Sequence, residues 1–184
     1  MSWAKNYVLV PDASDKSVQS LAKAMAKRYG VPPQNCIADA AFDSFQKESP
    51  NCVQSDLSTK LIVCAHGCKF GLNSNLDASG VATYLKKLGV SSVGLVAFKA
   101  CEVGKDSFLD ELSAELDKNQ ISFGYLIAYK GSVWKASGGR MRGFWGSWEI
   151  KGKDKDRVRI VQGKANVAAP GPRYVAHMER LHAE

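Results

Sequence analysis

Short apolar runs alternate along the first 130 residues with stretches in which apolar residues recur every three or four positions. A continuous apolar run is typical of a buried strand, and the three-and-four spacing is typical of an amphipathic helix. The apolar runs predict strands at 7–10, 36–40, 61–65, 93–98 and 123–129. The helical spacing predicts helices at 14–29, 79–88 and 106–118.

Polar and glycine residues mark the expected ends of these helices. Ser14 or Asp15 can cap the start of the first helix, and Gly30 can end it. Residues 107–110 have the pattern of a capping box at the start of the third helix. The polar stretch 43–60 is expected to be mostly loop.

Strands separated by helices of this length predict an α/β fold, with a mostly parallel sheet and helices on both faces. Beyond residue 131 the sequence becomes glycine-rich, aromatic and basic. Alternating runs there predict antiparallel hairpins attached to the sheet, at 143–150 and 157–161, followed by a short helix at 173–181. We expect one domain over 1–184, with an α/β core at 1–130 and a hairpin extension with a C-terminal helix at 131–184.

The composition narrows the class of protein. The chain has 184 residues, 45% of them hydrophobic and 23% charged, which is the profile of a globular domain with a real core. No apolar run is long enough for a membrane span, and residues 1–11 lack the apolar region of a signal peptide. We therefore expect a cytoplasmic protein, or one exported without a classical signal peptide.

The five cysteines are odd in number, which favours free thiols over a disulfide framework. Cys64 and Cys68 do not form a CxxC pair, and His177 and His182 lie far downstream at a spacing of five. No set of ligands therefore has the spacing of a zinc site, and no metal is expected.

Positive charge is concentrated in residues 129–164, which contain ten lysines and arginines and only three acidic residues, Glu149, Asp154 and Asp156. This segment accounts for the whole net charge of +7. It can attract phosphorylated ligands, nucleic acid or an anionic membrane surface, or it can be a solvated surface that keeps the protein soluble. The interleaved tryptophans more often anchor a hairpin than stack on bases, so a nucleic-acid partner is not favoured.

Two consecutive apolar strands end in residues that can do chemistry. His66 and Gly67 follow the strand at 61–65, and Cys101 follows the strand at 93–98. In open parallel sheets, functional groups gather beyond the carboxyl ends of strands. A thiol needs a base to become a good nucleophile, and imidazole titrates in the useful range. The backbone N–H groups of Gly67 and Cys101 can then hold a developing oxyanion.

Cys101 and His66 could each also have a purely structural role. Cysteine is among the most buried residue types, and a single histidine at a strand end is often only a hydrogen-bonded surface group. Cys64 falls within an apolar strand and is expected in the core. Cys68 is expected in a loop, where it would be a rival nucleophile.

The segment Leu61-Ile-Val-Cys-Ala-His66-Gly67, followed after a helix by Gly94-Leu-Val-Ala-Phe-Lys-Ala100-Cys101, resembles the caspase-like cysteine peptidases. Their pattern is an apolar block before His-Gly and a second apolar block before Ala-Cys or Gly-Cys, and the likeness covers about 61–133. It implies that Cys101 is the nucleophile, that His66 is the general acid/base, and that Gly67 with the Cys101 amide forms the oxyanion hole. A protein or peptide would be the substrate, and the resemblance also implies a segment that pairs with it, at Tyr129, Lys130, Gly131 and Ser132.

The chain departs from the caspases proper. Lys99 stands where their signature has Gln, and Gly104 lies one residue late, so aspartate specificity is not assumed. The layout is more similar to the self-cleaving protease domains of bacterial toxins, which implies a bacterial effector or toxin. Those domains are activated by inositol hexakisphosphate, so no cofactor is expected, and the resemblance implies only an inositol phosphate as an activator. A similar basic cluster is formed here by Lys151, Lys153, Lys155, Arg157 and Arg159.

Two other functions stay open at this stage. The first is a non-catalytic α/β binding module that docks nucleic acid or a polyphosphate on residues 129–164. The second keeps the cysteine chemistry but transfers an acyl group or acts on a non-peptide amide or ester. The sequence does not indicate an oligomeric state.

Overall fold

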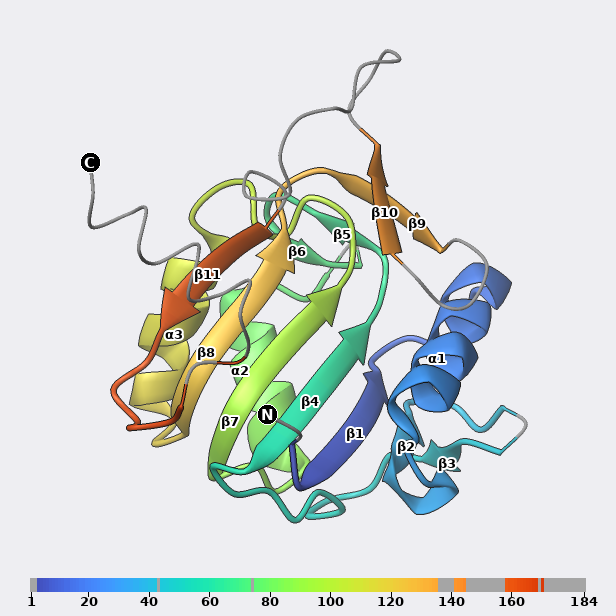
Figure 1. Cartoon of the computed structure of the whole chain (residues 1–184), viewed down its shortest axis with the longest axis horizontal. Coiled ribbons are helices and arrows are strands. Elements are labelled where there is room, and N and C mark those ends of the chain that lie inside the picture. The colour runs from blue at the N-terminus through green and yellow to red at the C-terminus, as the bar shows by residue number, and fades with distance from the viewer. Residues whose placement is uncertain are drawn as a thin grey trace.

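The computed structural model describes residues 3–42, 44–73, 75–135, 141–144, 158–168 and 170, with side chains for all of these except 133–135 and 141–144. The described residues form a seven-stranded sheet in the order β11-β8-β7-β4-β1-β2-β3 (Figure 1). Its strands are β1 (Lys5–Val10), β2 (Cys36–Ala38), β3 (Gln46–Lys47), β4 (Thr59–Cys64), β7 (Ser92–Lys99), β8 (Ser122–Tyr129) and β11 (Val158–Gln162). Neighbouring strands are parallel except for β11, which runs antiparallel to β8.

The helices are α1 (Lys16–Tyr29), α2 (Ala78–Lys87) and α3 (Phe108–Lys118), with a short 3-10 turn at Pro33–Asn35. Figure 1 shows α1 in front of the sheet and α2 and α3 behind it. Apolar residues of α1 pack with Val8 and Ile62, whereas those of α2 and α3 pack with Leu61 and Phe98 on the opposite face. Because helices cover both faces, the central strands are continuous apolar runs. The predicted α/β class with helices on both faces is confirmed.

The ends of α1 form as predicted. The Asp15 carboxylate accepts hydrogen bonds from the backbone N–H groups of Ser17 and Val18, and Gly30 ends the helix with a φ of 59°. The capping box predicted at the start of α3 is wrong. Ser107 has helical dihedral angles rather than the extended backbone of an N-cap, and its hydroxyl donates to Glu111 at 2.5 Å.

The C-terminal region differs from the prediction. The hairpin found there joins β9 (Ser132–Lys135) to β10 (Met141–Phe144), so it begins earlier than the predicted run at 143–150, whose remainder lies outside the described residues. The run at 157–161 forms β11, which is an edge strand of the main sheet rather than half of a separate hairpin. It joins there because Ile160 and Val161 pack against opposite faces of the sheet. The helix predicted at 173–181 lies outside the described residues.

None of the helices in the described part of the chain is long and apolar enough to cross a membrane. Within the same ranges, no group of three or more His, Cys, Asp or Glu side chains is arranged to hold a metal ion.

Candidate active site

His66 and Cys101 lie at the same edge of the sheet, on neighbouring strands. β4 and β7 pair in parallel, and their last paired residues are Cys64 and Lys99. His66 and Cys101 are each two residues beyond this pair, and parallel strands end at a common edge. The crossover through a single helix thus places His66 and Cys101 at the ends of adjacent strands.

Gly67 joins the two loops. A Cβ atom added at this position would lie 2.5 Å from the carbonyl oxygen of Cys101 and 2.8 Å from the Cβ of Ala100. It would also lie 2.6 Å from Cγ2 of the buried Val103. No side chain fits here, so the residue after His66 must be glycine for its backbone to pass this close to the Cys101 loop.

A tight hairpin follows His66 and fixes its backbone. The hairpin consists of β5 (Gly67–Cys68) and β6 (Gly71–Leu72). The N–H of Asn73, a residue with a φ of 51°, donates to the carbonyl of His66 at 2.9 Å. Leu72 and Leu76 exchange two further backbone hydrogen bonds. The carbonyl of His66 is therefore held by the end of the hairpin that follows it.

The loop of Cys101 is held by the segment that follows β8. Glu102 adopts a φ of 56° and donates its N–H to the carbonyl of Gly131 at 3.0 Å, and Gly104 donates to the carbonyl of Tyr129 at 2.8 Å. The predicted substrate-pairing residues 129–132 thus lie beside the Cys101 loop. Ser132 is the first residue of β9 and is paired with Phe144 of β10.

His66 has an acidic neighbour that the sequence did not reveal. Its imidazole is 60% exposed, and Nε2 lies 3.4 Å from Oδ1 of Asp15. Hydrogen bonds from the Ser17 hydroxyl and from the amides of Val18 and Ser17 lower the pKa of Asp15 to about 2, with a smaller contribution from His66. The carboxylate is therefore ionised and can stabilise a positive charge on the imidazole.

Asp15 was predicted only as a helix cap. The sequence did hold one indication of its contact with His66, because Asp15 follows the apolar strand β1. This strand is paired with β4, so Asp15 reaches the same edge of the sheet as His66. Asp12 lies in the same loop, and its pKa is also lowered, chiefly by hydrogen bonds from Ser14 and slightly by His66.

The other thiols differ in their surroundings. Cys64 is fully buried on β4, as predicted, and burial raises its pKa to about 12. Burial also raises the pKa of Cys36 to about 11. Cys68 and Cys101 are both half-buried. Among the described residues near His66, Cys68 therefore remains the rival thiol.

The predicted anion-binding cluster is only partly described. Lys151, Lys153, Lys155 and Arg157 lie outside the described residues. Arg159, on β11, forms an ion pair with Asp110 of α3 and donates to the carbonyl of Asp106. Its guanidinium thus links the edge strand to a helix.

A second group of cations lies on the α1 face of the sheet. Lys60 is only 8% exposed, and its ammonium lies 3.7 Å from the ring centroid of Tyr29. The ammonium of Lys99 lies 5.3 Å from the ring centroid of Tyr129. The pKa of each lysine is lowered to about 8, chiefly by burial, with smaller contributions from the charge of Arg28 in both cases and from Lys99 in the case of Lys60. No described carboxylate lies within ion-pair distance of either lysine.

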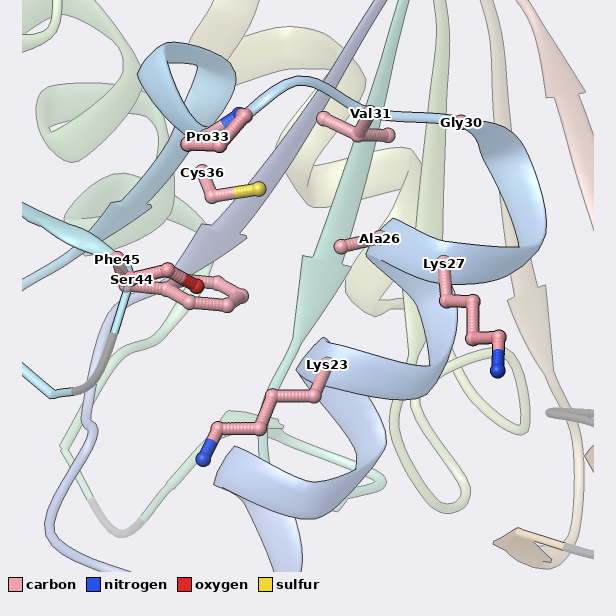
Figure 2. A pocket seen from close by; sticks show the side chains of 9 residues that line it. All are labelled: Lys23, Ala26, Lys27, Gly30, Val31, Pro33, Cys36, Ser44 and Phe45. Carbon is pink, nitrogen blue, oxygen red and sulfur yellow. The ribbon is translucent and has the colours of Figure 1, made fainter.

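A shallow pocket of about 300 Å³ lies away from this edge (Figure 2). Figure 2 shows that α1 contributes one wall, with two lysine side chains at the rim, and that the 3-10 turn and the segment before β3 contribute the other. It is lined by Lys23, Ala26, Lys27, Gly30, Val31, Pro33, Cys36, Ser44 and Phe45. The pocket adjoins the C-terminal half of α1, whereas Asp15 and His66 meet at the N-terminal end of that helix.

No family model and no curated protein matches the chain. Among solved structures, the chain is similar to a secreted C11 cysteine protease from Bacteroides thetaiotaomicron in complex with an irreversible peptide inhibitor, with a TM-score of 0.38 and 13% sequence identity. The alignment covers 68% of this chain and 49% of that protein. The chain thus spans about half the length of the protease it matches.

Proposed function

We propose that this chain is a caspase-like cysteine peptidase that hydrolyses peptide bonds through a thioester on Cys101. The observation that carries the proposal is the register of β4 and β7, which puts His66 and Cys101 two residues beyond paired positions at one sheet edge. The close passage of Gly67 over the Cys101 carbonyl ties the two loops together.

In the acylation step, His66 accepts the thiol proton while the sulfur of Cys101 attacks the scissile carbonyl carbon. The backbone N–H groups of Gly67 and Cys101 donate to the resulting oxyanion. As the tetrahedral intermediate collapses, the C–N bond breaks and His66 gives its proton to the leaving amine. Water, deprotonated by His66, then hydrolyses the thioester and restores the thiol.

Asp15 orients and supports the base in this proposal. Its carboxylate lies beside Nε2 of His66, which leaves Nδ1 as the ring nitrogen for the Cys101 thiol. The nearby negative charge stabilises the imidazolium that forms during attack, the role an acidic residue has in other nucleophile–histidine pairs.

The substrate is proposed to be an extended peptide that pairs with residues 129–132. Two backbone hydrogen bonds join this segment to the Cys101 loop, so a peptide aligned with it would pass the nucleophile. The acyl half of the substrate would then lie on the β8 side of Cys101.

The test is digestion of a peptide library by the purified chain, with mass-spectrometric identification of the products. We expect cleavage at defined sites that is lost in Cys101→Ala and His66→Ala and retained in Cys68→Ala. Cleavage that survives Cys101→Ala would refute the peptidase proposal, and transfer to an added amine in place of hydrolysis would favour the acyl-transfer alternative.

A second candidate function is favoured by the cations on the α1 face. Lys60 and Lys99 are desolvated, the charge of Arg28 disfavours the charged form of both, and neither has a described carboxylate partner. A bound polyanion would offset both the repulsion and part of the desolvation. We therefore propose that Arg28, Lys60 and Lys99 bind a polyanion of the inositol phosphate or polyphosphate class.

Such a ligand would also act on the nucleophile, since Lys99 precedes Cys101 by two residues and contacts the ring of Tyr129. The binding of inositol hexakisphosphate and of tripolyphosphate is measured by calorimetry at two salt concentrations. We expect Lys60→Gln and Lys99→Gln to weaken binding at least tenfold, with the exposed Lys47→Gln on β3 as the matched control. Equal affinity in all three variants would place any polyanion site elsewhere.

A further inference from the structure

The turn of the β5–β6 hairpin carries Lys69 and Phe70, three and four residues after His66. Phe70 is 70% exposed. The other exposed large apolar residue among those described is Leu57, at 36%. Leu57 precedes β4 and so lies at the opposite edge of the sheet from His66. A phenyl ring this exposed leaves considerable apolar surface in water at the rim of the candidate active site.

The hairpin that carries Phe70 lies against the Cys101 loop. Gly67 at its base packs against the Cys101 loop. At its turn, the ammonium of Lys69 lies 3.7 Å from the carboxylate of Asp106 and 4.7 Å from the ring centroid of Phe70. The hairpin that carries the ring is therefore joined to the Cys101 loop at its base and, through an ion pair, at its turn, so its backbone presents Phe70 beside that loop.

The order of the strands gives the direction of the substrate. β8, β7 and β4 are consecutive in the sheet, so residues 129–132 lie on one side of Cys101 and His66 lies on the other. His66 must reach the leaving amine to protonate it. If the acyl half of the substrate pairs with 129–132, the half that leaves passes over His66 and the hairpin that follows it.

We infer that Phe70 is a specificity-determining residue that contacts the first or second substrate residue after the cleaved bond and favours an apolar side chain there. This inference rests on the proposed peptidase function. An apolar contact of this size gives about a tenfold preference for leucine over serine at the contacted position.

The experiment uses peptide pairs built on a cleaved library sequence, identical except for Leu or Ser at the first and at the second position after the cut. The ratio of kcat/KM for the Leu and Ser peptides is measured for the unmodified chain, for Phe70→Ser and for Leu57→Ser. We expect a ratio of about ten for the unmodified chain and for Leu57→Ser at one of the two positions, and a ratio near one for Phe70→Ser.

The inference is overturned if Phe70→Ser, shown to be folded by circular dichroism, keeps the ratio of the unmodified chain at both positions. It is also overturned if the unmodified chain shows no preference. Failure of the peptidase proposal is a separate outcome, because neither peptide would then be cut by the unmodified chain, or cutting would survive Cys101→Ala.

Discussion

The two faces of the sheet differ in what they carry. The face under α2 and α3 is apolar from Leu61 and Val63 on β4 to Leu126 on β8. The face on the α1 side includes apolar residues too, but it also bears Lys60 and Lys99, and the start of α1 supplies Asp15 to His66. One face therefore stabilises the fold, while the other combines stability with charged groups that are costly to bury.

The largest expected effect is on the apolar face. Phe98 is fully buried and packs edge-to-face on Phe108, with ring centroids 6.0 Å apart. Phe98→Ala leaves a cavity and should lower the free energy of unfolding by about 3 to 5 kcal/mol, measured by urea denaturation. Leu57→Ala, at an exposed position, should change it by less than about 0.5 kcal/mol. If Phe98→Ala and Leu57→Ala lowered the free energy of unfolding equally, the face under α2 and α3 would not dominate the stability of the fold.

Gly67→Ala should damage the candidate active site with a smaller effect on the fold. The added methyl group meets the Cys101 carbonyl and Val103, so the two loops must separate. We expect kcat/KM for peptide cleavage to fall at least about a hundredfold, the range seen when one oxyanion donor is lost. Gly80→Ala, in α2, is the control, because a Cβ there would meet only side-chain atoms, at 3.2 and 3.3 Å. An active Gly67→Ala variant would contradict the proposed oxyanion hole.

Asp15→Asn separates the role of Asp15 as the cap of α1 from its proposed support of His66. Asparagine caps a helix about as well as aspartate, so α1 should keep its stability. Removal of the charge beside His66 should lower kcat about tenfold or more, with little change in KM. Asp77→Asn, at the corresponding cap of α2, is the matched control and should leave kcat unchanged. A loss of stability without a loss of kcat would reduce Asp15 to a cap.

The smallest effect concerns Lys60. Its pKa in the folded protein is about 8, below the ordinary 10.5, so the unfolded chain holds more protons between these pH values and stability rises with pH across that window. Lys60→Met removes this contribution and should be about 1 to 2 kcal/mol more stable than the unmodified chain at pH 7. The difference should shrink as the pH rises from 8 to 10.5. If urea denaturation gave the same difference in unfolding free energy between the two proteins at pH 8 and at pH 10.5, Lys60 would not be desolvated.

The sequence predicted the features that depend on local pattern. The apolar runs located β4 and β7, and His66 and Cys101 could be placed at one edge because a single crossover helix separates the two strands. Asp15 was recognised as a cap because capping is a local interaction. Its contact with His66 depends on β1 lying next to β4, which the strand order alone reveals.

Other features could not be predicted, because they depend on tertiary contacts. Arg28 lies on α1, Lys60 on β4 and Lys99 on β7, so the electrostatic interactions among them depend on how the helix packs on the sheet. The capping box at Ser107 fails because its hydroxyl bonds to Glu111, while Asp110 pairs with Arg159 across to β11. Both side chains of the expected motif therefore have other partners, one of them local and one on a distant strand.

The most direct test of the central claim is the reactivity of the thiols in the folded chain. Limiting iodoacetamide near neutral pH, followed by mass-spectrometric mapping, reports which cysteine is activated. The account predicts that Cys101 is labelled fastest and that His66→Ala removes this preference, while Cys68 is labelled slowly in both. Equal labelling of Cys68 and Cys101, or fast labelling of Cys101 that persists in His66→Ala, would contradict it.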